Sequence, residues 1–179
     1  MVQATSHTDS SKAQASAHQD AVALLKADHR KVEGLFESFE KARGAERKAA
    51  LVAEICTELK IHTAIEEEIF YPACRGKIEE DLLDEAYVEH DAAKKLMAEL
   101  EASAPDEEFY DAKVKVLSEE IEHHVEEEEK RAEGMFAQAK KAGLDMDALG
   151  DEMAARKAQL LQQAKAGAPL PAEPTTFKD

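Results

Sequence analysis

Two pairs of histidine and glutamate have the spacing of metal ligands on a helix. His62 and Glu66 are four residues apart, as are His124 and Glu128. Residues four apart lie one turn apart on the same helical face, so both side chains of each pair can reach one centre. A set of imidazoles and carboxylates suits iron or manganese, whereas structural zinc usually recruits thiolates. The two pairs therefore predict a metal site.

Two further histidines make this pattern an internal repeat. His29 precedes His62 by 62 − 29 = 33 residues, and His90 precedes His124 by 124 − 90 = 34 residues. The segments DHRKVEGLFESFE and EHDAAKKLMAELE, around the first histidine of each pair, are similar. A two-helix unit used twice predicts a pseudo-twofold site with one metal nearer each half. The two glutamates would bridge the metals and leave positions open for water, oxide or a diatomic ligand.

The candidate ligands fall on apolar stripes with helical spacing. Leu25 and Val32 flank His29 in this way, and Leu117 and Ile121 precede His124. Burying six ionisable groups without compensation costs several kcal/mol per group. A metal supplies the opposing charge and binds the lone pairs, which favours a shared centre over a plain bundle with chance histidines.

The stripes predict an all-α fold, an up-down four-helix bundle with an extra C-terminal helix. The predicted helices cover residues 20–43, 46–71, 78–103, 106–139 and 146–165. We expect Asp106 to cap the fourth helix and the fifth helix to pack across one end of the bundle. The short connections predict antiparallel neighbours.

Composition sets the domain organisation and excludes several classes of partner. Residues 1–18 and 167–179 are predicted to be disordered tails, and residues 19–166 the helical domain. A formal net charge of −16 argues against nucleic acid and an anionic membrane surface as partners. We find no signal peptide or spanning segment, and the two cysteines predict reduced thiols in a cytoplasmic protein.

Four local segments resemble the haemerythrin-like, HHE cation-binding family: ADHRKVEGLF, HTAIEEEIFYP, VEHDAAKKLMAEL and HHVEEEEKRAEGMF. The resemblance runs from about Ala21 to Phe136. It implies a haemerythrin-like fold holding two Fe ions as an oxo- or hydroxo-bridged di-iron pair. The ligands that it implies are the terminal histidines His29, His62, His90 and His124, and the bridging glutamates Glu66 and Glu128.

The chain departs from the oxygen-carrying members of that family at two positions. Lys94 stands where those proteins have an extra histidine, four residues after His90. Their fourth helix carries an aspartate five residues after its histidine. Glu129 holds that place here, although the chain fits HxxxE better. One histidine fewer predicts a more open iron, which favours reaction with peroxide, oxygen or nitric oxide over oxygen carriage.

Several other residues compete for roles in the site. His123 and Glu127 form a second HxxxE pair, but they lie off the apolar stripe. Tyr87, three residues before His90, is predicted to be a core tyrosine that could also reach the centre. A ferritin-like site needs two ExxH motifs, and the chain offers one candidate off the stripe, so that fold is excluded. Glu67, Glu68, Glu126 and Glu129 are predicted to be surface acids, one of which could serve as an extra ligand or contact a ligand from outside. The remaining assignments are Cys56 as a packing residue, Cys74 in an accessible loop, and His7 and His18 in the tail.

The sequence leads to two functional hypotheses beside the plain bundle. The first is a non-haem di-iron protein that binds or reacts with a small oxidant, either a diatomic molecule or peroxide. The second is an iron- or oxygen-responsive sensor module without turnover, in which the tails transmit the state of the centre. The sequence leaves open whether the protein is an enzyme, and it predicts a monomer or weak homo-oligomer.

Overall fold

The computed structural model describes residues 19–177, and this part of the chain is helical without any strand. The all-α prediction is therefore confirmed. The helices are α1 (Ala21–Lys41), α2 (Ala45–Ile65), the π-helical turn η1 (Glu66–Phe70), α3 (Tyr71–Cys74), α4 (Glu80–Ala102), α5 (Tyr110–Glu129), α6 (Met135–Lys141) and α7 (Met146–Lys165). Residues 1–18, predicted to be a tail, lie outside the described residues.

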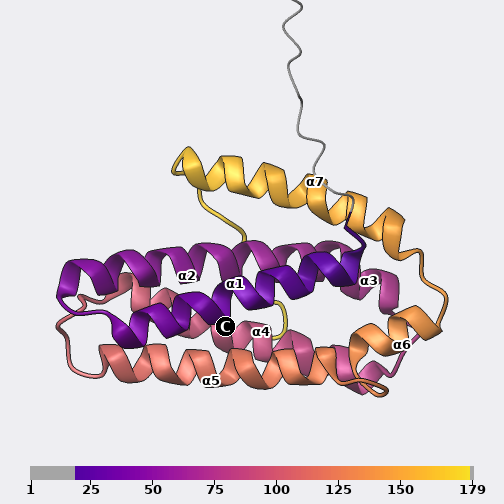
Figure 1. Ribbon diagram of the computed structural model, residues 1–179, viewed down its shortest axis with the longest axis horizontal. Coiled ribbons are helices and arrows are strands. Elements are labelled where there is room, and N and C mark those ends of the chain that lie inside the picture. Colours follow the sequence, from indigo (N-terminus) through magenta and orange to yellow (C-terminus); the bar gives the residue numbers. More distant parts are fainter. Residues whose placement is uncertain (1–18, 178–179) are drawn as a thin grey trace, which may run out of the picture.

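Four long helices form the predicted bundle (Figure 1). Helix α1 packs against α2 and α5, and α4 packs against α2 and α5, which closes the ring. The Asp20 carboxylate caps α1 by accepting a hydrogen bond from the Ala23 N–H at 2.7 Å. Gly44, with a φ of 85°, makes the left-handed turn that reverses the chain between α1 and α2.

The extra helix α7 is present but is oriented differently from the prediction. It lies along α1 and α2 rather than across one end of the bundle (Figure 1). Its buried residues Met146, Met153 and Leu160 are seven apart, so its apolar stripe runs nearly its whole length. Gly150 allows the helix to approach the start of α1, because a Cβ there would lie 2.4 Å from the Gln19 carbonyl oxygen.

Two other predicted helix boundaries were wrong. The fourth helix starts at Tyr110 after Phe109, whose φ is 70°, so Asp106 lies in the preceding turn and does not cap it. The same helix ends at Glu129 instead of continuing to residue 139, and α6 follows after a tight turn. Gly134 makes this turn possible, since a Cβ there would lie 2.6 Å from the Lys130 nitrogen.

The second predicted helix continues beyond its expected end. The segment α2–η1–α3 passes through Pro72 and reaches Cys74. Pro72 lies in the first turn of α3, where a missing N–H is tolerated. Cys74 is therefore buried on a helix and not in an accessible loop.

A polar layer divides the apolar core of the bundle. One apolar cluster includes Leu25, Ile65 and Phe70 and extends under α6 and α7. The other includes Phe36 and Leu117 and fills the opposite end. The candidate metal ligands lie between the two clusters.

The segment after α7 also differs from the prediction. Residues 171–177 lie against α4 and η1 instead of forming a disordered tail. None of the helices within residues 19–177 is long and apolar enough to cross a membrane.

Candidate metal centre

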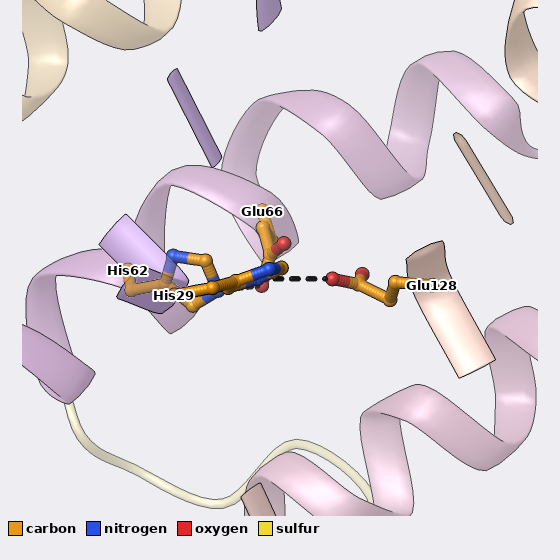
Figure 2. Close-up of side chains that lie close together, drawn as sticks. All are labelled: His29, His62, Glu66 and Glu128. Carbon is orange, nitrogen blue, oxygen red and sulfur yellow. Dashed lines mark hydrogen bonds and ion pairs between the residues drawn. The ribbon is translucent and has the colours of Figure 1, made fainter. Parts of the chain in front are cut away.

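The structure brings all six predicted ligands together in the buried layer of the bundle. Each long helix contributes one histidine, and the two glutamates come from η1 and α5. Figure 2 shows His29, His62, Glu66 and Glu128 pointing toward one another. Both glutamates are almost completely buried, with 0% exposure for Glu66 and 1% for Glu128.

The four imidazoles turn their Nε2 atoms inward in two pairs. The Nε2 atoms of His29 and His62 are 3.2 Å apart. Those of His90 and His124 are 3.3 Å apart. Each pair combines a histidine from the first helix of a unit with one from the second, as the repeat predicts.

Each glutamate lies between the two histidine pairs. Glu66 Oε2 is 3.1 Å from His62 Nε2 and 3.3 Å from His90 Nε2. Glu128 Oε2 is 3.4 Å from His29 Nε2 and 3.7 Å from His124 Nε2. Ligand atoms that could hold an ion therefore form two adjacent groups that share Glu66. Glu66 belongs to both groups, whereas Glu128 belongs to one and faces His124 of the other at 3.7 Å.

Unsatisfied atoms at the centre fit a bound cation. Glu66 Oε1 and Glu128 Oε2 are buried and have no hydrogen-bond partner within the described chain. A buried carboxylate oxygen without a partner costs free energy that a coordinated cation removes. The donor atoms present, imidazole nitrogens and carboxylate oxygens, suit iron.

Neighbouring carboxylates raise the pKa of two histidines at the centre. Burial lowers the pKa of His62, but the carboxylates of Glu66 and Asp28 outweigh it and raise this pKa to about 10. Burial is likewise outweighed at His124, where Glu128 and Glu89 raise the pKa to about 9. Burial acts to raise the pKa of Glu66, yet His62 holds it well below its ordinary value. Protonated His62 and His124 thus place positive charge beside the buried glutamates, as a bound cation would.

A second set of carboxylates orients the histidines from outside. Three Nδ1 atoms lie within hydrogen-bond distance of an acid, in the pairs His29–Glu129 (2.8 Å), His90–Glu67 (3.0 Å) and His124–Glu89 (2.7 Å). The fourth, His62 Nδ1, lies 3.7 Å from Asp28 Oδ2. Such contacts fix the imidazole tautomer and leave Nε2 free for a metal. Glu129 therefore holds His29 from outside the centre, and Glu67 is a partner of His90 and not only a surface acid.

Tyr71 is a residue of the centre that the sequence analysis missed. Its hydroxyl oxygen lies 3.1 Å from His90 Nε2, 3.2 Å from Glu128 Oε1 and 3.4 Å from Glu66 Oε2. Burial and the nearby Glu128 carboxylate raise the pKa of Tyr71 well above its ordinary value, so the phenol keeps its proton. Tyr87, which the sequence favoured as a core residue, packs against the Tyr71 ring with centroids 5.2 Å apart.

The π-helical turn η1 places Tyr71 at the centre. The Tyr71 N–H bonds to the Glu66 carbonyl five residues earlier, as in a π turn. On a regular α-helix, residues five apart point about 140° away from each other. The wider turn returns both side chains to one face. The sequence signal is a tyrosine five residues after Glu66, a spacing that a regular α-helix does not place on the ligand face.

One protein-family profile matches the part of the chain that contains these residues. The profile described as the Hemerythrin HHE cation binding domain matches residues 20–136, more than half of the chain. The chain belongs to this family. It is therefore a haemerythrin HHE domain protein, and its family binds metal cations.

A solved structure supports the fold of this HHE domain. The crystal structure of a hemerythrin HHE cation binding domain-containing protein from Mycobacterium kansasii is 26% identical and superposes with a TM-score of 0.69. The match covers 84% of this chain and 95% of that one. A protein from Nostoc sp. named DNA nickase is 28% identical over 106 residues, which are 59% of this chain but only 30% of that protein.

Two residues of this HHE domain, Lys94 and His123, lie outside the set of candidate ligands. Lys94 Nζ contacts Glu67 at 2.7 Å and Asp91 at 3.3 Å, so it lies outside the ligand set. His123 is on the surface of α5, with 63% of its side chain exposed, which agrees with its place off the apolar stripe. The competing pair His123–Glu127 therefore does not contribute to the buried centre.

Proposed function

We propose that this HHE domain holds two iron ions and uses them to bind or react with a small oxidant. The four inward Nε2 atoms would be terminal ligands, and the two glutamates would bridge the ions. The observation that carries the proposal is a pair of buried carboxylate oxygens, Glu66 Oε1 and Glu128 Oε2, at the two groups of candidate ligands. Neither oxygen has a hydrogen-bond partner within residues 19–177. Bound iron would supply the exchange of electrons with the oxidant.

The surroundings of the centre support a ligand of very small size. A cavity of about 10 Å³ lies beside the four histidines, with apolar walls that include Val32, Leu59, Ile121 and Val125. This volume holds about one water molecule. Larger organic substrates do not fit such a space. The apolar walls would also exclude bulk water.

Tyr71 would supply a hydroxyl at the centre. Its phenol keeps its proton at neutral pH and lies within 3.4 Å of both bridging carboxylates. In this proposal Tyr71 Oη donates a hydrogen bond to whatever oxygen atom occupies the open position.

Metal content and reactivity test the proposal together. Protein expressed with ample iron should contain about two irons per chain and show near-ultraviolet absorption from a bridged pair. Mixing the reduced protein with peroxide, oxygen or nitric oxide should change this absorption. Glu66→Gln should abolish the response, whereas Glu54→Gln, an exposed carboxylate on α2, should preserve it. Wild-type protein that repeatedly lacks iron under these conditions refutes the proposal.

A sensor role is the second candidate, and the C-terminal segment is the observation that favours it. The Thr175 hydroxyl donates to Glu67, and Glu67 contacts His90. A change at His90 could therefore release residues 171–177. Limited proteolysis should then cleave this segment at different rates in metal-free and iron-loaded protein, without meaningful peroxide turnover. Equal rates exclude this role.

We propose no action on DNA for this HHE domain. The relative named DNA nickase shares less than a third of its length with this chain. A net charge of −16 opposes contact with phosphates, so we infer no nucleic-acid partner. A cytoplasmic location stays a prediction from the two cysteines, which are unpaired.

A further inference from the structure

Three of the four outer carboxylates that face a histidine are paired with a lysine or arginine. Glu129 contacts Lys26 at 3.2 Å and Arg30 at 2.7 Å. The other two ion pairs are Glu67 with Lys94 and Asp28 with Lys157. Each of these positive charges compensates the negative charge of a carboxylate beside the centre.

Glu89, the fourth outer carboxylate, has no such counterion within residues 19–177. Its Oε2 lies 2.7 Å from His124 Nδ1. Its Oε1 faces His123 Nε2 at 3.7 Å, and Glu127 Oε1 lies 3.6 Å from the same nitrogen. Ligand atoms of Glu89, His123 and Glu127 all lie within 4.8 Å of one another. A group of this kind could hold a cation.

A third acid lies beside this group. Glu120 lies one helical turn before His123, and its Oε2 is buried without a hydrogen-bond partner in the described chain. Burial and the nearby Glu89 carboxylate raise the pKa of Glu120. Three carboxylates thus converge beside a single imidazole.

In the first unit of the internal repeat, lysines compensate the negative charge of the acids at the equivalent positions. The offset between units is 90 − 29 = 61 residues on the first helices and 124 − 62 = 62 on the second helices. Glu89 therefore corresponds to Asp28, which is paired with Lys157 from α7. Glu120 corresponds to Glu58, which is paired with Lys31 at 2.6 Å.

The second unit has no equivalent of Lys31 and carries potential ligands in place of two isoleucines. Lys31 corresponds to Ala92, and the counterparts of Ile61 and Ile65 are His123 and Glu127. In the first unit Ile61 and Ile65 are buried in the apolar cluster that extends under α7. The second unit instead leaves an imidazole and two carboxylates partly exposed, with His123 at 63%, Glu127 at 32% and Glu89 at 21%.

We propose that Glu89, His123 and Glu127 bind a divalent first-row transition-metal ion on the surface of α4 and α5, with Glu120 beside it. The ion takes the place that Lys157 and Lys31 occupy in the first unit. Mixed imidazole and carboxylate ligands favour ions such as Mn²⁺, Fe²⁺ or Zn²⁺ over Mg²⁺ and Ca²⁺, which prefer oxygen alone. Glu89 would join this outer ion to His124, because its two oxygens face one group each. The outer site goes beyond the proposed di-iron function and does not depend on it.

Manganese binding to the full-length, iron-loaded protein tests the outer site. The electron paramagnetic resonance signal of free Mn²⁺ should fall as one further ion binds per chain. His123→Asn and Glu127→Gln should weaken this binding by about 10- to 100-fold. Glu126→Gln removes the same charge from an exposed neighbour on α5 and should leave binding unchanged. Modulation from an imidazole nitrogen should appear in pulsed spectra of wild type and disappear in His123→Asn.

Two outcomes overturn the outer site. One is that wild-type protein retains no Mn²⁺. The other is that His123→Asn and Glu127→Gln retain Mn²⁺ as well as wild type does. Iron content, measured on the same samples, should not change in these two variants, so a failure of the di-iron proposal is recognised separately. Since both residues are partly exposed, neither substitution should prevent folding, and thermal unfolding checks this.

Discussion

The Glu67 carboxylate lies 3.0 Å from His90 Nδ1 and connects this histidine to the end of the described chain. Glu67 also accepts hydrogen bonds from Lys94 Nζ at 2.7 Å and from the Thr175 hydroxyl at 3.2 Å. The fully buried Asp91 carboxylate accepts the backbone N–H groups of the same C-terminal segment, at 2.8 Å for Thr175. Residues 171–177 therefore belong to the network that positions a predicted ligand.

Removing residues 171–179 should destabilise the protein and weaken its hold on metal. Asp91 would lose several charge-assisted hydrogen bonds, each worth about 1.5–3 kcal/mol, and water would replace part of them. We expect a net loss of about 2 kcal/mol, which corresponds to a fall of about 4–8 °C in the melting temperature. Removing only residues 178–179 is the matched control. A truncated chain with unchanged melting temperature and iron content would contradict this role.

Replacing Tyr71 with phenylalanine should change the centre while preserving the fold. The ring keeps its packing, but Glu66, Glu128 and His90 lose the hydroxyl that they share. Loss of such a partner typically lowers metal affinity or activity by about 10- to 100-fold. Iron titration and the near-ultraviolet band measure this effect. Tyr87→Phe is the control, and equal effects of the two substitutions would show that Tyr71 acts only through packing.

Glu128→Gln should reduce metal binding without unfolding the bundle. The amide has the shape of the carboxylate but lacks the charge that bridges two cations, so we expect affinity to fall by at least about 100-fold. Differential scanning calorimetry should show a rise in melting temperature when iron is added to wild type and almost none in the variant. Glu126→Gln, on the exposed side of α5, should behave like wild type. A full rise in the variant would show that Glu128 is not a ligand.

Metal loading at neutral pH should release protons. The pKa of His62 is raised to about 10 and that of His124 to about 9 when no metal is bound. Both imidazoles are therefore positively charged at pH 7, with both ring nitrogens protonated. A metal requires the neutral imidazole, and binding must displace these protons. Affinity should therefore increase with pH between 7 and the raised pKa values and change little above them. A pH indicator in weak buffer measures the release, and loading without release would contradict protonated imidazoles.

The sequence predicted the six candidate ligands because they lie on regular α-helical stripes. A period of three to four residues is enough to place His29, His62, His90 and His124 on the inner faces of their helices. The repeat then paired the units correctly. Their role as ligands stays a prediction until metal is measured.

The features that were missed depend on local irregularity and on packing. Tyr71 reaches the centre only because the π turn η1 shifts its register, and no helical period contains such a shift. The end of α5 is set by the close approach at Gly134, although EEEEK favours a continuing helix. The proline-rich end of the chain gave no sign of docking, because its main anchors are backbone N–H groups on Asp91.

The π turn occurs in one unit of the repeat and has no equivalent in the other. Helix α5 ends at Glu129, so only the first unit carries a phenol to the centre. Two irons held there would differ in their surroundings, since the Tyr71 hydroxyl lies closest to His90. Their reduction potentials should separate, and electrons should enter in two distinct one-electron steps. A frozen sample of the oxidised protein should give two Mössbauer quadrupole doublets, whereas a symmetric duplicated bundle would give one.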